Sequence, residues 1–154
     1  MASILYEDIY SSFLGSVSDY SFIKLEQFEM VEVLQEYVHK ALAGSYVRRQ
    51  FESLKLDDDV QKLNYELRNS VDEDADKEFV INMVTNYMVY EWSKKQANNI
   101  SLTAQMFAGA EQKFYSQSNH LEELLALRDS SLQIAKDYIV EHTSFNNSYL
   151  RGDK

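Results

Sequence analysis

The sequence predicts an all-α, single-domain protein: a bundle of about four main helices with some short helices and a flexible C-terminal tail. The 154 residues include no proline and only four glycines, so the residues that most often interrupt helices are nearly absent. Apolar residues recur at three- and four-residue steps through most of the chain, as in amphipathic helices. A chain of this length can close one hydrophobic core.

The first half of the chain contains two long periodic segments and one weaker segment. We expect a first helix from Ser3, as its N-cap, to about Leu14, where Gly15 ends it. A second helix fits residues 26–47, and Gly44 weakens its end without stopping it. Residues 48–70 are less periodic, and the acidic triplet at 57–59 indicates the N-terminus of a short helix.

The second half predicts two further long helices. The capping-box pattern at 70–73 predicts a helix that runs to about Lys95, and Asn98-Asn99 is expected to end it. Residues 100–114 then form a short helix and a loop around Gly109. Asn119, with a glutamate three residues later, is expected to open the last helix, which runs to about residue 142. We therefore assign residues 1–142 to the helical domain and residues 143–154 to a polar tail.

Composition excludes several kinds of site and partner. Cysteine is absent, which excludes disulfides and thiolate chemistry. The net charge of −10 disfavours a nucleic-acid binder, because phosphates would be repelled. No apolar run reaches the roughly 18 residues of a membrane span, and the first residues lack the pattern of a signal peptide. We expect a protein that is made in a cytoplasm.

Two patterns that could hold a metal are explained better without one. Glu36 and His39 have the Glu-x-x-His spacing of carboxylate metal bundles, but the other histidines lack the matching glutamate. The acids at 72–78 alternate as in a calcium loop, yet Lys77 and Met83 occupy the positions that need glycine and a bidentate acid. No nucleophile elbow or phosphate loop is present. We expect no cofactor, no metal and no enzymatic activity, with a metalloenzyme centred on Glu36 and His39 as an alternative.

Tyrosine is unusually abundant. Eleven tyrosines and eight phenylalanines are more than one core of this size must hold. One explanation is a tyrosine-rich core boundary, and the alternative is contact with neighbouring subunits, where tyrosine is favoured; periodicity does not separate the two. The residues expected at a subunit or portal interface are Tyr6, Tyr10, Tyr46, Arg48, Arg49, Tyr149, Leu150 and Arg151.

Three motifs carry a resemblance to a known family. They are Ile9-Tyr-Ser-Ser-Phe13-Leu with Val17-Ser-Asp19-Tyr, then Met88-Val-Tyr-Glu91-Trp92, and finally Phe114-Tyr115-Ser116-Gln-Ser-Asn119-His-Leu121. In this order, over about residues 4–140, the chain resembles the head–tail connector (adaptor or neck) proteins of tailed bacteriophages. It departs from them at Ser93 and at Gln117-Ser118.

The resemblance implies a structural virion protein at the head–tail junction, assembled in the cytoplasm of the bacterial host. Such proteins form a ring, commonly a dodecamer, below the portal protein. They extend the channel through which DNA passes and dock the next neck or tail component. An acidic protein suits such a channel, because repulsion keeps DNA from sticking.

Two alternatives act by protein–protein binding as well. One is another phage assembly factor, such as a tail-completion protein. The other is a cytoplasmic helical regulator that holds a partner helix in a groove. The regulator would be a monomer or dimer without a ring, so the native mass separates it from a connector.

Overall fold

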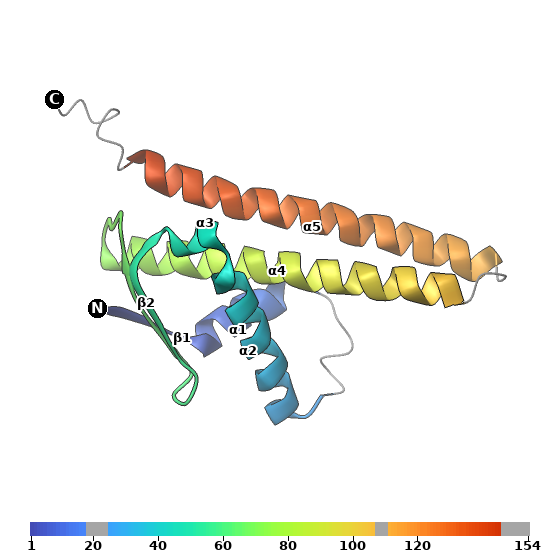
Figure 1. The fold of residues 1–154 in the computed structure, drawn as a ribbon, viewed down its shortest axis with the longest axis horizontal. Helices are drawn as coiled ribbons and strands as arrows, with labels where there is room; N and C mark the ends of the chain where they lie inside the picture. Colours follow the sequence, from blue (N-terminus) through green and yellow to red (C-terminus); the bar gives the residue numbers. More distant parts are fainter. Residues whose placement is uncertain (18–24, 107–110, 146–154) are drawn as a thin grey trace.

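The computed structural model describes residues 1–17, 25–106 and 111–145, in which five helices accompany one three-stranded sheet (Figure 1). The expectation of a mostly helical chain is confirmed, but the sheet makes this an α+β fold and the all-α assignment is wrong. In chain order the elements are β1 (Ala2–Leu5), α1 (Tyr6–Ser16), α2 (Gln27–Ala43), α3 (Ser45–Arg48), β2 (Phe51–Asp57), β3 (Lys62–Leu67), α4 (Glu73–Met106) and α5 (Glu111–Phe145).

Residues 51–67 form a β-hairpin where a short helix was expected. β3 lies in the middle of the sheet and pairs antiparallel with both β1 and β2. Leu63, Tyr65 and Leu67 are buried, while the residues between them face outward or lie partly exposed. This two-residue alternation is the pattern of a strand with one buried face. The acids at 57–59 therefore lie at a turn rather than at a helix N-terminus.

The N-terminus is also a strand, so the expected helix over residues 3–14 begins too early. Residues 2–5 pair with β3, with Ile4 opposite Leu63, and Ile4 is buried. α1 then starts at Tyr6, whose backbone N–H donates to the Gln61 carbonyl at 2.8 Å. Ser3 is thus a strand residue and not a helix cap.

α2 begins where the sequence predicted but ends earlier. Glu26 and Glu29 form a capping box, in which the Glu26 N–H donates to the Glu29 carboxylate at 3.1 Å. At the other end Gly44 has extended backbone angles (φ −65°, ψ 138°) and separates α2 from the single turn of α3. The expectation that the helix passes through Gly44 is wrong.

α4 and α5 are longer than expected and form a helical hairpin. α4 starts at Glu73 because the Asp72 side chain accepts the Ala75 N–H at 2.8 Å. It continues through Asn98 and Asn99 to Met106, so the predicted break there is wrong. α5 starts at Glu111 instead of Asn119. The loop expected around Gly109 and most of the predicted tail, residues 146–154, lie outside the described residues.

One hydrophobic core connects the sheet, α1, α2 and the α4–α5 hairpin. α1 and α2 both pack on α4, and α5 runs along α4 on the opposite side from α1 and α2 (Figure 1). Tyr6, Phe13, Leu63, Met83 and Met88 are among the largest fully buried side chains. No helix in the described part of the chain combines the length and hydropathy that crossing a membrane demands.

Candidate functional site

The turn of α3 presents an exposed tyrosine beside two arginines. Val47 is 1% exposed and anchors this turn in the core. Tyr46 is 41% exposed, and Arg49, three residues later, lies on the same side of the turn. Arg48 and Arg49 are both exposed, and within the described part of the chain neither forms an ion pair. Their charges are therefore available to a partner.

α4 continues this surface with two tyrosines and a lysine. Tyr87, Tyr90 and Lys94 follow at helical spacing and are all half-buried. The Lys94 ammonium lies 5.0 Å from the centre of the Tyr90 ring, and it pairs with Glu91 at 2.9 Å. The pKa of Tyr87 is raised by burial and by the neighbouring Tyr46 and Tyr90. We group these α4 residues with the exposed α3 pair, and we call Tyr46, Arg49, Tyr87, Tyr90 and Lys94 the tyrosine–arginine face.

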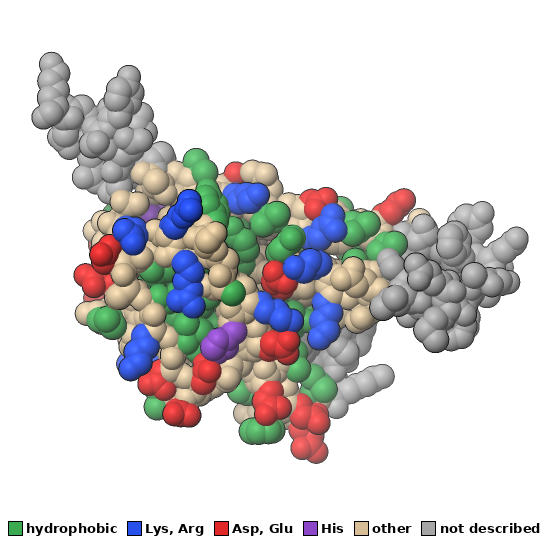
Figure 2. Space-filling model, in the orientation of Figure 1, with side chains coloured by type: hydrophobic (Ala, Val, Ile, Leu, Met, Phe, Trp, Pro, Cys, Tyr) green, Lys and Arg blue, Asp and Glu red, His purple; other side chains and the backbone are tan. Residues whose placement is uncertain are grey.

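This face is cationic in a strongly acidic chain. Residues 37–51 and 92–99 contain lysines or arginines but no acidic residue, whereas the whole chain has a net charge of −10. In Figure 2, lysine and arginine side chains lie over the middle of the side shown, and acidic side chains lie among them and at the margins. The two segments without acidic residues still provide basic side chains that can complement an acidic surface.

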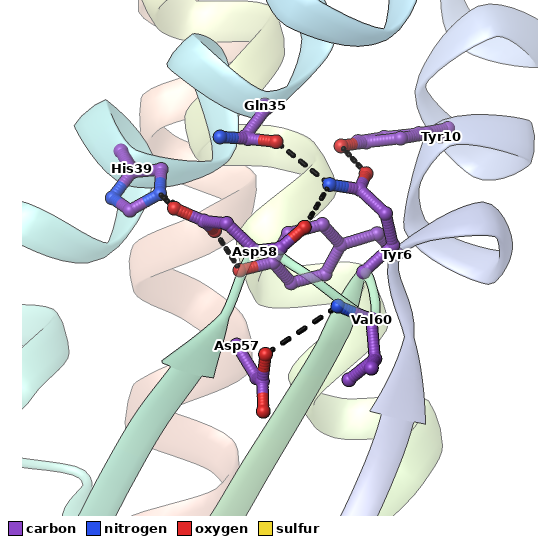
Figure 3. Close-up of polar contacts among 8 residues, drawn as sticks. Tyr6, Tyr10, Gln35, His39, Asp57, Asp58 and Val60 are labelled. Carbon is purple, nitrogen blue, oxygen red and sulfur yellow. Dashed lines mark hydrogen bonds and ion pairs between the residues drawn. The ribbon is translucent and has the colours of Figure 1, made fainter.

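A second polar cluster fixes the β2–β3 turn to α1 and α2 (Figure 3). We call it the hairpin latch, and its members are Tyr6, Tyr10, Gln35, His39, Asp58 and Gln61. The Tyr6 hydroxyl donates to Asp58 Oδ1 at 2.7 Å, and His39 Nε2 contacts Asp58 Oδ2 at 2.9 Å. Burial and the Asp58 carboxylate raise the pKa of Tyr6, so the phenol stays protonated and acts as a donor. Desolvation tends to raise the pKa of Asp58, but the hydrogen bonds from Tyr6 and His39 outweigh it and lower that pKa.

Gln61 completes the latch from the other side of the turn. Its Nε2 donates to Gln35 Oε1 at 2.7 Å and to the Asp58 carbonyl at 2.8 Å, and its Oε1 accepts the Tyr10 hydroxyl at 2.9 Å. Gln61 has a φ of 52°, a left-handed conformation that is uncommon for a residue with a side chain. These hydrogen bonds offset that cost and hold the turn in one position.

The structure divides the expected interface residues into three groups. Tyr46, Arg48 and Arg49 lie together and exposed on or beside α3. Tyr6 and Tyr10 are 0% and 8% exposed and belong to the core and the hairpin latch, so we no longer assign them to an interface. Their burial was missed because residues 57–61 were expected to start a helix, whereas they form the turn whose Asp58 and Gln61 accept the two tyrosine hydroxyls. The remaining expected residues, Tyr149, Leu150 and Arg151, lie outside the described residues.

Sequence reasoning missed the contribution of α4 to the surface. None of Tyr87, Tyr90 and Lys94 is among the interface residues that the sequence suggested. The signal was present in the spacing, because residues 87, 90 and 94 fall on one side of a helix. What the spacing could not show is that this side of α4 stays half-buried in the fold.

Glu36 and His39 do not converge on a common point. Glu36 pairs with Lys40 at 2.8 Å, and His39 contacts Asp58 instead. Across the described residues no group of three or more histidine and carboxylate side chains is placed to hold a metal ion.

Comparison with protein-family models, with curated proteins and with solved structures found no match to this chain.

Proposed function

We propose that this chain is a structural virion protein: a head–tail connector that forms a ring between the portal and the next neck or tail component. The resemblance of its three ordered motifs to connector proteins supports this setting. The observation that carries a binding function is the tyrosine–arginine face. Tyrosine and arginine are enriched at protein interfaces, where they contribute large contact areas and directional hydrogen bonds.

The described parts of the motifs lie in elements that build the body of the fold, whereas residues 18–20 of the first motif lie outside the described residues. Ile9 and Phe13 of the first motif are 0% exposed in α1. The second motif lies in α4, where Met88 and Trp92 are buried and Tyr90 reaches the tyrosine–arginine face. The same segment thus supports both the core and the proposed contact surface.

The net charge of −10 supports a place beside DNA. A ring that turns its cationic faces toward neighbouring subunits leaves acidic surfaces free to face the channel. Such surfaces repel the phosphate backbone, so the DNA slides through without sequence-specific binding.

The native mass of the purified full chain, alone and mixed with the portal protein of the same genome, tests this function. We expect a ring, or a smaller species that becomes a ring on the portal, in light scattering and negative-stain images. A stable monomer or dimer that ignores the portal would instead indicate the cytoplasmic regulator. A variant with Arg48→Glu and Arg49→Glu should lose the assembly, and the matched pair Arg128→Glu and Lys136→Glu, on α5, should keep it.

A further inference from the structure

We propose that the tyrosine–arginine face binds the tip of the β2–β3 hairpin of a second copy of this chain. The inference rests on the proposed connector function for its biological setting, and it names the two surfaces that meet between neighbouring subunits. The tip is defined here as residues 57–60, the last residue of β2 and the turn that follows it.

The tip combines negative charge with one exposed apolar side chain. It contains three consecutive aspartates followed by Val60, which is 61% exposed. Asp58 is held by the hairpin latch, whereas Asp59 is exposed and, among the described residues, forms no ion pair. An exposed valine beside a free carboxylate is matched by a surface of aromatic rings beside a free guanidinium.

The tyrosine–arginine face supplies that match. Its tyrosine rings can cover the Val60 side chain, and the Arg49 guanidinium can pair with the Asp59 carboxylate. The hairpin latch fixes the tip before binding, so little conformational entropy is lost when the contact forms. Other exposed apolar side chains, such as Phe28, have an acidic surrounding on α2 and lack this charge match.

The two surfaces cannot meet within one copy. β2 has seven residues between the α3 region and the tip, and an extended strand of that length spans about 20 Å. Because β2 is paired with β3 along its length, it stays extended and keeps the hairpin tip apart from the tyrosine–arginine face of the same copy. The contact must join different copies, and because it unites two different surfaces it repeats from copy to copy and generates a ring or a filament.

Exchanging charge across the contact tests the inference with the full chain and without portal protein. We expect the wild-type chain to self-associate in analytical ultracentrifugation. Arg49→Glu alone and Asp59→Lys alone should each weaken that association at least about tenfold, the loss typical of a central charged pair. Mixing the two variants should restore it, because each tip then finds a face of opposite charge.

Two control variants carry the same charge changes elsewhere. Lys136→Glu and Glu122→Lys alter exposed residues of α5 and should leave self-association unchanged. Circular dichroism of every variant confirms that it is folded. A wild-type chain that stays monomeric at its solubility limit overturns the inference, and so does association that ignores Arg49→Glu and Asp59→Lys. Neither result depends on portal binding, so the connector function stands or falls separately.

Discussion

His142 lies where α5 passes the first turns of α4. Its imidazole stacks flat on Phe79, with ring centres 4.0 Å apart and planes 7° from parallel. Burial lowers the pKa of His142, while the Asp76 carboxylate and the Asn69 backbone act in the opposite direction. Its Nε2 is buried and, in the described part of the chain, accepts and donates no hydrogen bond. The neutral ring is therefore the form that this packing accommodates.

The free energy of unfolding should fall as the pH drops through about 6.5, the pKa of an unperturbed histidine. Below that pH the unfolded chain binds a proton at His142 more readily than the folded chain does, since the folded pKa is lower. The unfolding free energy stops falling once the pH is below the pKa of His142 in the folded chain. Urea unfolding at several pH values measures it.

His142→Phe keeps an aromatic ring on Phe79 and removes the titration. The difference between the wild-type and His142→Phe curves should therefore contain this pH dependence. His120→Gln, an exposed histidine of the same helix, serves as the control and should retain the wild-type profile. Parallel profiles for wild-type and His142→Phe would contradict the assignment.

Gly44 sets the boundary between two elements. Its φ of −65° is open to any residue, and a Cβ added there would meet no other atom within 4 Å. The extended ψ of 138° turns the chain so that α3 leaves the axis of α2. This bend places Val47 in the core and Tyr46 on the tyrosine–arginine face.

Gly44→Ala should stabilise the protein by about 0.4–1 kcal/mol, because alanine has fewer conformations to lose on folding. The gain requires that residue 44 keep its extended conformation. Thermal or urea unfolding measures the free energy, and binding by the tyrosine–arginine face reports whether α3 has moved. Destabilisation together with lost binding would show that alanine fuses α2 and α3 into one helix.

At the scale of the whole molecule, α5 is bound to the rest mainly through α4. Ile139 is 2% exposed and belongs to the common core, whereas its neighbour Val140 is 58% exposed. Trp92 on α4 is 5% exposed and reports the core directly. The shared core predicts that the helical hairpin and the sheet unfold together.

Ile139→Ala should cost about 2–5 kcal/mol of unfolding free energy, because it removes a buried side chain and leaves a cavity. Val140→Ala should change it by less than about 0.5 kcal/mol. Trp92 fluorescence and helical circular dichroism should follow one urea transition in both variants. A loss of helix before the Trp92 signal changes would show that α5 unfolds independently.

Local patterns in the sequence predict that most of the chain is helical, and they predict the apolar stripes that form much of the core. The apolar stripes of α2, α4 and α5 repeat at the helical period, and caps such as Glu26 are local signals, so both can be read without knowing the fold. Tyr46, Arg48 and Arg49 were named for their residue type, and the structure leaves all three exposed, while their place at an interface stays a prediction.

The three-stranded sheet and the full set of residues in the tyrosine–arginine face are visible only in the tertiary structure. β1 pairs with β3 across about sixty residues of sequence, as in Ser3 opposite Asn64, and short alternating segments do not reveal such distant partners. The turn between β2 and β3 gives the Tyr6 and Tyr10 hydroxyls their partners, Asp58 and Gln61. The contribution of α4 to the tyrosine–arginine face likewise depends on how the chain folds between α3 and α4. Hydrogen bonding and packing between segments far apart in the sequence determine both the strand pairing and the burial of these tyrosines. Local periodicity carries no information about such distant partners.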